Sequence, residues 1–139
     1  MLSQTQVDLI RNSAERLADA NVAATNAFYA NLFKVAPGIR NLFSEDMFEQ
    51  SEKLWNTIVK VVESASNLTE IEAELKALGA RHVKYGAEPA HYIVVTDVLI
   101  QTISTLMNKE WTDETRVAWK TAREAVCATM LEGAAQHAG

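Results

Sequence analysis

Three polar side chains are placed by their spacing on the apolar faces of three different predicted helices. His82 lies one turn after Leu78, on a stripe of apolar residues. Gln50 lies one turn before Leu54, and Tyr29 lies on the apolar face of an earlier helix. A neutral imidazole can ligate a metal, and an amide or a phenol hydroxyl can donate a hydrogen bond into a buried site. These residue types therefore suit a metal ligand on one side of a site and two donors on the other.

Each of the three residues also has a plainer interpretation. A histidine, a glutamine or a tyrosine on an apolar face can be a core or helix-end residue whose polar atoms bond to the backbone or to solvent. Gly79, three residues before His82, costs a helix about 1 kcal/mol relative to alanine, and it would let a flat group approach closely. Together these residues suit a haem iron that binds a small gas, because a donor stabilises the negative charge that bound dioxygen takes from ferrous iron. Such a hydrogen bond contributes about 1.5–3 kcal/mol, or about 10- to 150-fold in affinity.

The sequence lacks the short motifs of other chemistries. It contains no glycine-rich phosphate loop and no H-E-x-x-H, C-x-x-C or G-x-S-x-G sequence. Its three histidines and one cysteine are too few and too scattered for a typical zinc site built from protein ligands alone. A metal at His82 would therefore arrive in a cofactor.

Capping and stop signals predict the helices that must position these residues. Ser3-x-x-Gln6 has the form of a capping box and opens the first helix. Asn21 can cap a second helix, which Pro37 ends before a short helical corner. Apolar residues then recur at helix spacing, and no segment alternates as a strand would. Further helices are expected over about 48–65, 69–86 (opened by a second capping box, Thr69-x-x-Glu72), 89–108 and 112–136.

Composition predicts a single all-α domain over residues 1–139, with six or more helices. Hydrophobic residues make up 48% of the 139 residues, which argues against disorder, and the net charge of −5 gives no basic footprint for nucleic acid or an anionic membrane. The single cysteine excludes an internal disulfide, no signal peptide is evident, and the apolar runs are expected to fall far short of a membrane span. We therefore expect a soluble cytoplasmic protein. The alternative fold is a simple helix bundle that binds only protein partners.

Four stretches carry a resemblance to a known family. "NAFYANLFKVAPGIRNLF", "EQSEKL", "LGARHVKYGAEPAHY" and "VAWKTAREAV" follow one another in the order found in bacterial single-domain globins. The chain resembles these globins over nearly its whole length, and it is similar to the globin domain of flavohaemoglobins. The resemblance implies a globin fold of six to eight helices around a pocket for haem b.

The resemblance also assigns roles to individual residues. It implies that His82 is the proximal ligand of the haem iron, and that Phe43 packs against the porphyrin. It implies that Tyr29 and Gln50 are distal residues that hydrogen-bond the gas. The apolar residues expected to line the pocket are Leu54, Leu78 and Val98.

The distal position has an alternative, and several cations have rim roles. A gap-free alignment to some relatives places Lys53 instead of Gln50 at the distal position. With Gln50 and Leu54 on the inward face, Lys53 falls at the rim, where it could pair with a haem propionate. Arg81 and Lys84 flank the proximal histidine and could do the same. Each of these cations could equally be an ordinary solvated residue, since a rim ion pair contributes only about 0–1 kcal/mol.

One departure from the flavohaemoglobin pattern concerns the proximal side. In that pattern a tyrosine and a glutamate hold the proximal histidine, and the carboxylate makes the imidazole a stronger donor, which favours oxidative chemistry. Tyr92 matches the tyrosine. The glutamate is expected fifteen residues after Trp119, where this chain has Ala134. Glu132 stands two positions earlier, on the wrong face of a helix.

The leading functional prediction is haem-based binding of dioxygen, or of another small gas such as carbon monoxide or nitric oxide, for storage or transport. The enzymatic alternative is nitric oxide dioxygenation, which would need a separate reductase as a partner. A third possibility is a helical interaction module without haem. The sequence favours a binding protein over an enzyme, and it leaves the oligomeric state open.

Overall fold

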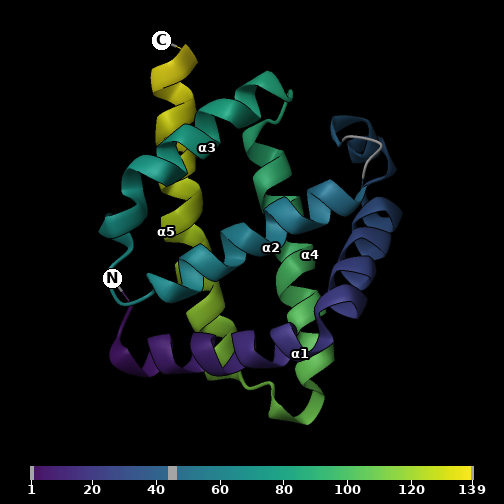
Figure 1. Ribbon diagram of the computed structural model, residues 1–139, viewed down its shortest axis with the longest axis vertical. Helices are drawn as coiled ribbons and strands as arrows, with labels where there is room; N and C mark the ends of the chain where they lie inside the picture. Colours follow the sequence, from purple (N-terminus) through teal and green to yellow (C-terminus); the bar gives the residue numbers. More distant parts are fainter. Residues whose placement is uncertain (1, 44–46, 139) are drawn as a thin grey trace.

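The computed structural model describes residues 2–43 and 47–138, and these residues confirm the predicted all-α fold (Figure 1). No strand occurs within these two ranges. The α-helices are α1 (Gln4–Val35), α2 (Met47–Glu63), α3 (Glu72–Lys84), α4 (Pro89–Met107) and α5 (Asp113–Ala138), and the short 3-10 helices are η1 (Pro37–Leu42), η2 (Leu68–Ile71) and η3 (Asn108–Glu110).

Several helix boundaries follow the signals in the sequence. The capping box at the start of α1 is confirmed: the Gln6 backbone N–H donates to the Ser3 hydroxyl at 3.1 Å, and the Ser3 N–H donates to the Gln6 side chain at 3.0 Å. Pro89 stands in the first turn of α4, where its missing N–H leaves no hydrogen bond unmade. At the start of α5 the Thr112 hydroxyl accepts the Thr115 N–H at 3.1 Å.

Two boundary predictions are wrong. Asn21 does not start a new helix, since α1 continues through it to Val35; Figure 1 instead shows α1 bending part-way along its length, so that its second half rises beside α4. The second capping box is absent because α3 begins at Glu72, after η2. Thr69 lies inside η2, and its hydroxyl donates to the Asn67 side chain.

The main core lies where α1, α4 and α5 meet. Ile10 from α1, Ile103 from α4 and Trp119 from α5 are buried in one cluster there. A second buried cluster joins the C-terminal half of α1 to η1 and α4, and a third joins η2 and α3 to α4 and α5. The two smaller clusters contain the residues that the sequence predicts for the site.

The backbones of α3 and α5 touch where the two helices cross (Figure 1). A Cβ added at Gly79 would lie 1.8 Å from the Met130 carbonyl oxygen, and a Cβ added at Gly133 would lie 2.1 Å from the Lys76 carbonyl oxygen. The expectation that Gly79 makes room for a flat group is therefore wrong. Its bare face meets α5, because only glycine allows two helix backbones to approach this closely.

The expectation that no segment approaches a membrane span also needs correction. Pro89–Glu110, which covers α4 and η3, is long and apolar enough to cross a membrane by length and composition, with a mean hydropathy of 1.3 over an 18-residue window. In the fold, α4 packs against both α1 and α5 and buries Ile100 and Ile103 among them. The apolar residues of α4 thus supply part of the core.

We predict that Gly79→Ala destabilises the protein. The alanine methyl group would overlap the Met130 backbone, and overpacking of this kind lowers the free energy of unfolding by about 1–3 kcal/mol. The better helix propensity of alanine, about 1 kcal/mol, offsets only part of this loss. Urea denaturation measures the change. Gly38→Ala is the matched control, because a Cβ at Gly38 has no atom within 4 Å. A Gly79→Ala variant as stable as the control would refute the contact.

Candidate functional site

His82 lies in the last turn of α3; one ring nitrogen is engaged, and the other has no hydrogen-bond partner among residues 2–43 and 47–138. Its Nδ1 is 2.8 Å from the Leu78 carbonyl oxygen, which can only accept a hydrogen bond, so Nδ1 carries the proton. Burial lowers the pKa of His82 from its ordinary value, the nearby Arg81 charge lowers it further, and the bond to Leu78 opposes both effects. A neutral ring with its Nε2 lone pair available is the form that ligates a metal.

Two tyrosines flank the His82 ring. The ring of Tyr85 lies 5.7 Å away, edge-on and half exposed, and the ring of Tyr92 lies 5.8 Å away and is buried. Burial raises the pKa of the Tyr92 hydroxyl. The predicted neighbour Tyr92 is thus placed beside His82, packed with Met130 of α5 in the third cluster.

No carboxylate of the described residues bonds to His82. Glu132 instead lies 3.3 Å from Lys76, in an ion pair between α5 and α3, and its side chain is 56% exposed. Position 134, where the flavohaemoglobin pattern has glutamate, is alanine. The backbone carbonyl of Leu78, an uncharged acceptor, is therefore the group that orients the imidazole.

Tyr29 lies in a cluster of aromatic rings. Its ring contacts Phe28 at 4.9 Å and Phe43 at 5.8 Å, both edge-on, and it stacks on Phe33 at 5.9 Å. The side chain is 7% exposed, and burial raises the pKa of its hydroxyl to about 12. The hydroxyl makes no hydrogen bond to residues 2–43 and 47–138, and its oxygen is not among the fully buried polar atoms that lack a partner. A protonated, unpartnered hydroxyl inside an apolar cluster is a donor available to a small ligand.

The structure groups the predicted lining residues into two clusters. Val98 is buried in the cluster of Tyr29, with Phe43 and Leu54 packed against it. Leu78 packs instead against the third cluster, beside Tyr92. The residues expected on the distal side thus come together from α1, η1, α2 and α4, and those expected on the proximal side come from α3 and α4.

The polar residues predicted for the distal position and for the rim differ in exposure. Gln50 is half-buried, whereas Lys53 is exposed and pairs with Glu49 at 3.2 Å. Arg81 and Lys84 are also exposed, and neither has an ion-pair partner within the part of the chain that the structure describes. This arrangement favours Gln50 over Lys53 as the inward-facing residue.

Sequence reasoning missed Phe33 as a site residue. Phe33 stacks on Tyr29 and lies edge-on to Phe43 at 5.7 Å. The Arg40 guanidinium lies 5.3 Å from the centre of the Phe33 ring, a cation–π contact that covers the cluster. The spacing contained the signal, because Phe33 is four residues after Tyr29 and so stands on the same helix face.

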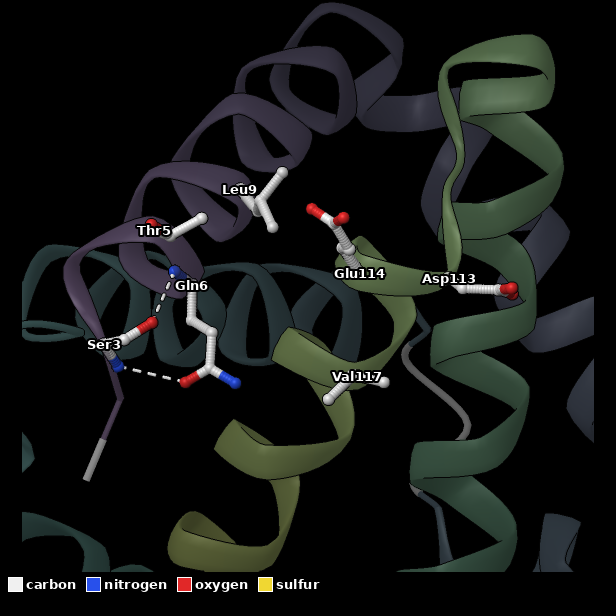
Figure 2. Close-up of a pocket in the computed structure, with 7 residues that line it drawn as sticks. All are labelled: Ser3, Thr5, Gln6, Leu9, Asp113, Glu114 and Val117. Atoms are coloured by element: carbon white, nitrogen blue, oxygen red, sulfur yellow. Dashed lines mark hydrogen bonds between the residues drawn. The ribbon is translucent and has the colours of Figure 1, made fainter.

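A hollow in the surface lies away from His82 and Tyr29, and none of the predicted site residues lines it. Figure 2 shows it between the first turns of α1 and α5, beside the Ser3–Gln6 capping box. Its volume is about 300 Å³, and Asp113 and Glu114 give it acidic side chains. It lies several turns along α5 from Met130, where α3 crosses. The predicted site residues therefore lie apart from this hollow.

Comparison with known families decides which fold this is. A family model for globins matches residues 26–130, which is most of the chain. The chain belongs to the globin family. Globins bind haem and small gaseous ligands, and their helices pack around the haem pocket.

Curated relatives of this globin have several functions. It is 30% identical over 135 residues to flavohaemoprotein B of Dictyostelium discoideum, covering 95% of this chain and 31% of that protein. It is 32% identical over 133 residues to an anaerobic nitrite reductase of Gossypium hirsutum, covering 84% of each chain.

Solved structures resemble the globin closely in fold. An engineered carbene transferase, derived from a putative nitric oxide dioxygenase of Rhodothermus marinus, superposes with a TM-score of 0.85 at 26% identity, covering 98% of this chain and 95% of that one. A bacterial globin from Campylobacter jejuni gives a TM-score of 0.84 at 22% identity, covering 96% and 97%.

We predict that the stability of this globin at alkaline pH depends on Tyr29. Because folding raises its pKa to about 12, Tyr29 contributes stability that is present below about pH 10 and is lost as the pH rises toward 12. The full effect is roughly 3 kcal/mol. Tyr29→Phe should therefore lose less stability than the wild type between about pH 9 and about pH 11, as measured by urea denaturation.

The control for this measurement is Tyr85→Phe, since Tyr85 is 52% exposed. This variant should follow the wild type between the two pH values. If Tyr29→Phe loses as much stability over this pH range as the wild type does, burial does not raise the pKa of Tyr29.

Proposed function

We propose that this globin binds haem b through His82 and reversibly binds dioxygen or another small diatomic gas. The observation that carries the proposal is the half-buried, neutral His82 ring, whose Nδ1 is held by Leu78 and whose Nε2 bonds to no residue that the structure describes. When bound, haem supplies a ferrous iron with an open position for the gas. The residues present fit such a group, because an imidazole and an unpartnered donor hydroxyl lie in apolar surroundings.

The chain's apolar residues would hold the ring and exclude water. Phe43, Leu54 and Val98 offer an apolar wall on the side of Tyr29, and Leu78 offers one on the side of His82. Water exclusion matters because hydrogen bonds are stronger in a medium of low dielectric constant. The exposed cations Lys53, Arg81 and Lys84 would stand at the rim, where they can meet the carboxylates of the cofactor.

Tyr29 and Gln50 would act as donors to the bound gas. The raised pKa of Tyr29 keeps its hydroxyl protonated at neutral pH, and an amide is neutral at any physiological pH. A hydrogen bond to a ligand that carries negative charge contributes about 1.5–3 kcal/mol. Gln50 is the proposed second donor because it is half-buried, whereas Lys53 is exposed and pairs with Glu49.

The acceptor on the proximal side supports gas binding over oxidative chemistry. A carboxylate that accepts from Nδ1 would make the imidazole a stronger electron donor to iron. In this chain the acceptor is the neutral Leu78 carbonyl, and Glu132 is engaged by Lys76. His82 is therefore expected to be an ordinary neutral ligand, which suits reversible binding.

Nitric oxide dioxygenation is the second candidate. It is favoured by the similarity to flavohaemoprotein B and to the putative nitric oxide dioxygenase of Rhodothermus marinus. The reaction joins one nitric oxide, one dioxygen and one electron to give nitrate, so it needs an electron donor. The nitrate yield per haem with a supplied reductase separates the candidates: many equivalents mean an enzyme, and about one equivalent leaves the binding function.

We predict that His82→Ala abolishes most haem binding. The substitution removes the proposed iron ligand, while α3 keeps its contact with α5 through Gly79. The ratio of haem absorbance to protein absorbance, recorded with reduced protein under carbon monoxide, measures the loss. His91→Gln is the control, because His91 caps α4 by accepting the Glu88 N–H and glutamine can replace that acceptor. Unchanged haem content in His82→Ala would exclude His82 as the ligand.

We also predict that Tyr29→Phe raises the rate of dioxygen dissociation. Loss of one hydrogen bond to the bound gas corresponds to an increase of up to about 150-fold. Stopped-flow displacement of dioxygen by carbon monoxide measures the rate. Gln50→Leu should raise it as well, whereas Lys53→Gln should leave it close to the wild-type value. A Tyr29→Phe rate equal to that of the wild type would mean that the hydroxyl does not touch the ligand.

A further inference from the structure

The direction in which the Tyr29 hydroxyl points is set by the packing of neighbouring aromatic rings, since the hydroxyl makes no hydrogen bond to the described residues. Phe28 lies edge-on to the Tyr29 ring at 4.9 Å and is only 2% exposed, so the core holds it in place. Phe33 and Phe43 contact the Tyr29 ring at 5.9 Å and 5.8 Å, and both are only partly buried. A hydrogen bond weakens steeply as its angle closes, so a donor needs neighbours that are themselves held in place.

Arg40 contacts both of these partly buried phenylalanines. Its guanidinium lies 5.3 Å from the centre of the Phe33 ring, within the range of a cation–π contact. Its Nη1 donates a hydrogen bond to the Phe43 backbone carbonyl at 3.3 Å. Arg40 stands in η1, between the end of α1 and Phe43, which is the C-cap of η1. One side chain thus joins the last turn of α1 to the residue that follows η1.

An arginine suits this double contact because its guanidinium is flat. One face of the group can lie over a ring while the N–H groups at its edge donate in the plane. The two phenylalanines also touch one another, since Phe33 lies edge-on to Phe43 at 5.7 Å. Tyr29 therefore belongs to a set of three mutually contacting rings, and Arg40 is attached to the other two residues of the set.

We propose that Arg40 is a positioning residue for Tyr29: it holds Phe33 and Phe43 against the Tyr29 ring and so fixes the direction in which the hydroxyl donates to a bound gas. The inference deepens the proposed function and rests on it, because Tyr29 is the proposed donor. Arg40 acts through the two phenylalanines and not by touching the ligand. Its removal should therefore have an effect only while the Tyr29 hydroxyl is present.

The first test is the rate of dioxygen dissociation in a double-mutant cycle of Arg40→Gln and Tyr29→Phe. Arg40→Gln should raise the rate by about 2- to 5-fold, which corresponds to the loss of an exposed cation–π contact. Arg40→Gln added to Tyr29→Phe should raise the rate no further, because the hydroxyl that Arg40 positions is already gone. The rate is read only from molecules that hold haem and gas, so a partly unfolded sample does not change it.

The second test is the C–O stretching band of the carbon monoxide complex. A hydrogen-bond donor directed at bound carbon monoxide weakens the C–O bond and lowers its stretching frequency. In Arg40→Gln the band should move to a higher frequency, towards its position in Tyr29→Phe, or split as the hydroxyl takes several directions. Phe33→Leu removes the ring that Arg40 covers and should move the band in the same direction; no movement there would break the link between Arg40 and Tyr29.

Lys34→Gln is the matched control for charge. Lys34 follows Phe33 directly, is exposed, and makes no hydrogen bond or ion pair to any residue that the structure describes. The variant removes one positive charge, as Arg40→Gln does, and should leave both the dissociation rate and the C–O band at their wild-type values. Equal changes in the two variants would mean that only the positive charge matters, which would overturn the inference.

Two further results would overturn it. One is an Arg40→Gln effect on the rate that is the same with and without the Tyr29 hydroxyl, which means that the two residues act independently. The other is an unchanged C–O band together with faster loss of haem, which means that Arg40 holds the cofactor and does not position Tyr29. Failure of the proposed function is read separately, because a protein that binds no haem gives no carbon monoxide complex at all.

Discussion

The close contact between the backbones of α3 and α5 decides where His82 stands. Gly79 lies three residues before His82 on α3, and Gly133 is its counterpart on α5. Two helices that touch through glycines are fixed in separation and in rotation, because a side chain of any size at either position would collide with the other backbone. The rotation of α3 turns the His82 side toward Tyr92 and leaves Lys84 outside. The positions of the proposed iron ligand and of the Leu78 carbonyl that orients it both depend on this contact.

Helix periodicity was sufficient to predict much of this fold, but not the contacts of the residues that depart from the apolar pattern. Apolar spacing placed His82, Tyr29 and Leu54 on inward faces, because period and burial are coupled in any packed helix. The sequence showed that Gly79 lacks a side chain, but not which neighbour fills the space. The partner is more than fifty residues away in α5 and is brought near only by the fold. The Thr69 capping box failed for a related reason, since the chain forms the 3-10 helix η2 at Thr69 and begins α3 only at Glu72.

The site was predictable to different degrees on its two sides. On the proximal side, the lack of a carboxylate was visible in the sequence, because Ala134 has no ionisable group. That Leu78 takes its place as acceptor was not visible, since a backbone carbonyl has no sequence signature. On the proposed distal side, Tyr29 was predicted from its position on the apolar face of a helix. Phe33 was overlooked, because the sequence pattern of a core phenylalanine does not show which neighbour it packs against.

The hydropathy of α4 has a consequence for the newly made chain. This helix is apolar enough to be mistaken for a membrane segment, and it is kept in the fold by partners on both sides. One partner, α1, precedes it in the chain and has already left the ribosome when α4 emerges. The other, α5, follows and is made last. During synthesis, α4 is therefore shielded first by α1, with smaller contributions from α2, η2 and α3, and only later by α5. The long, bent helix α1 thus also covers part of the apolar surface of α4 before α5 has been made.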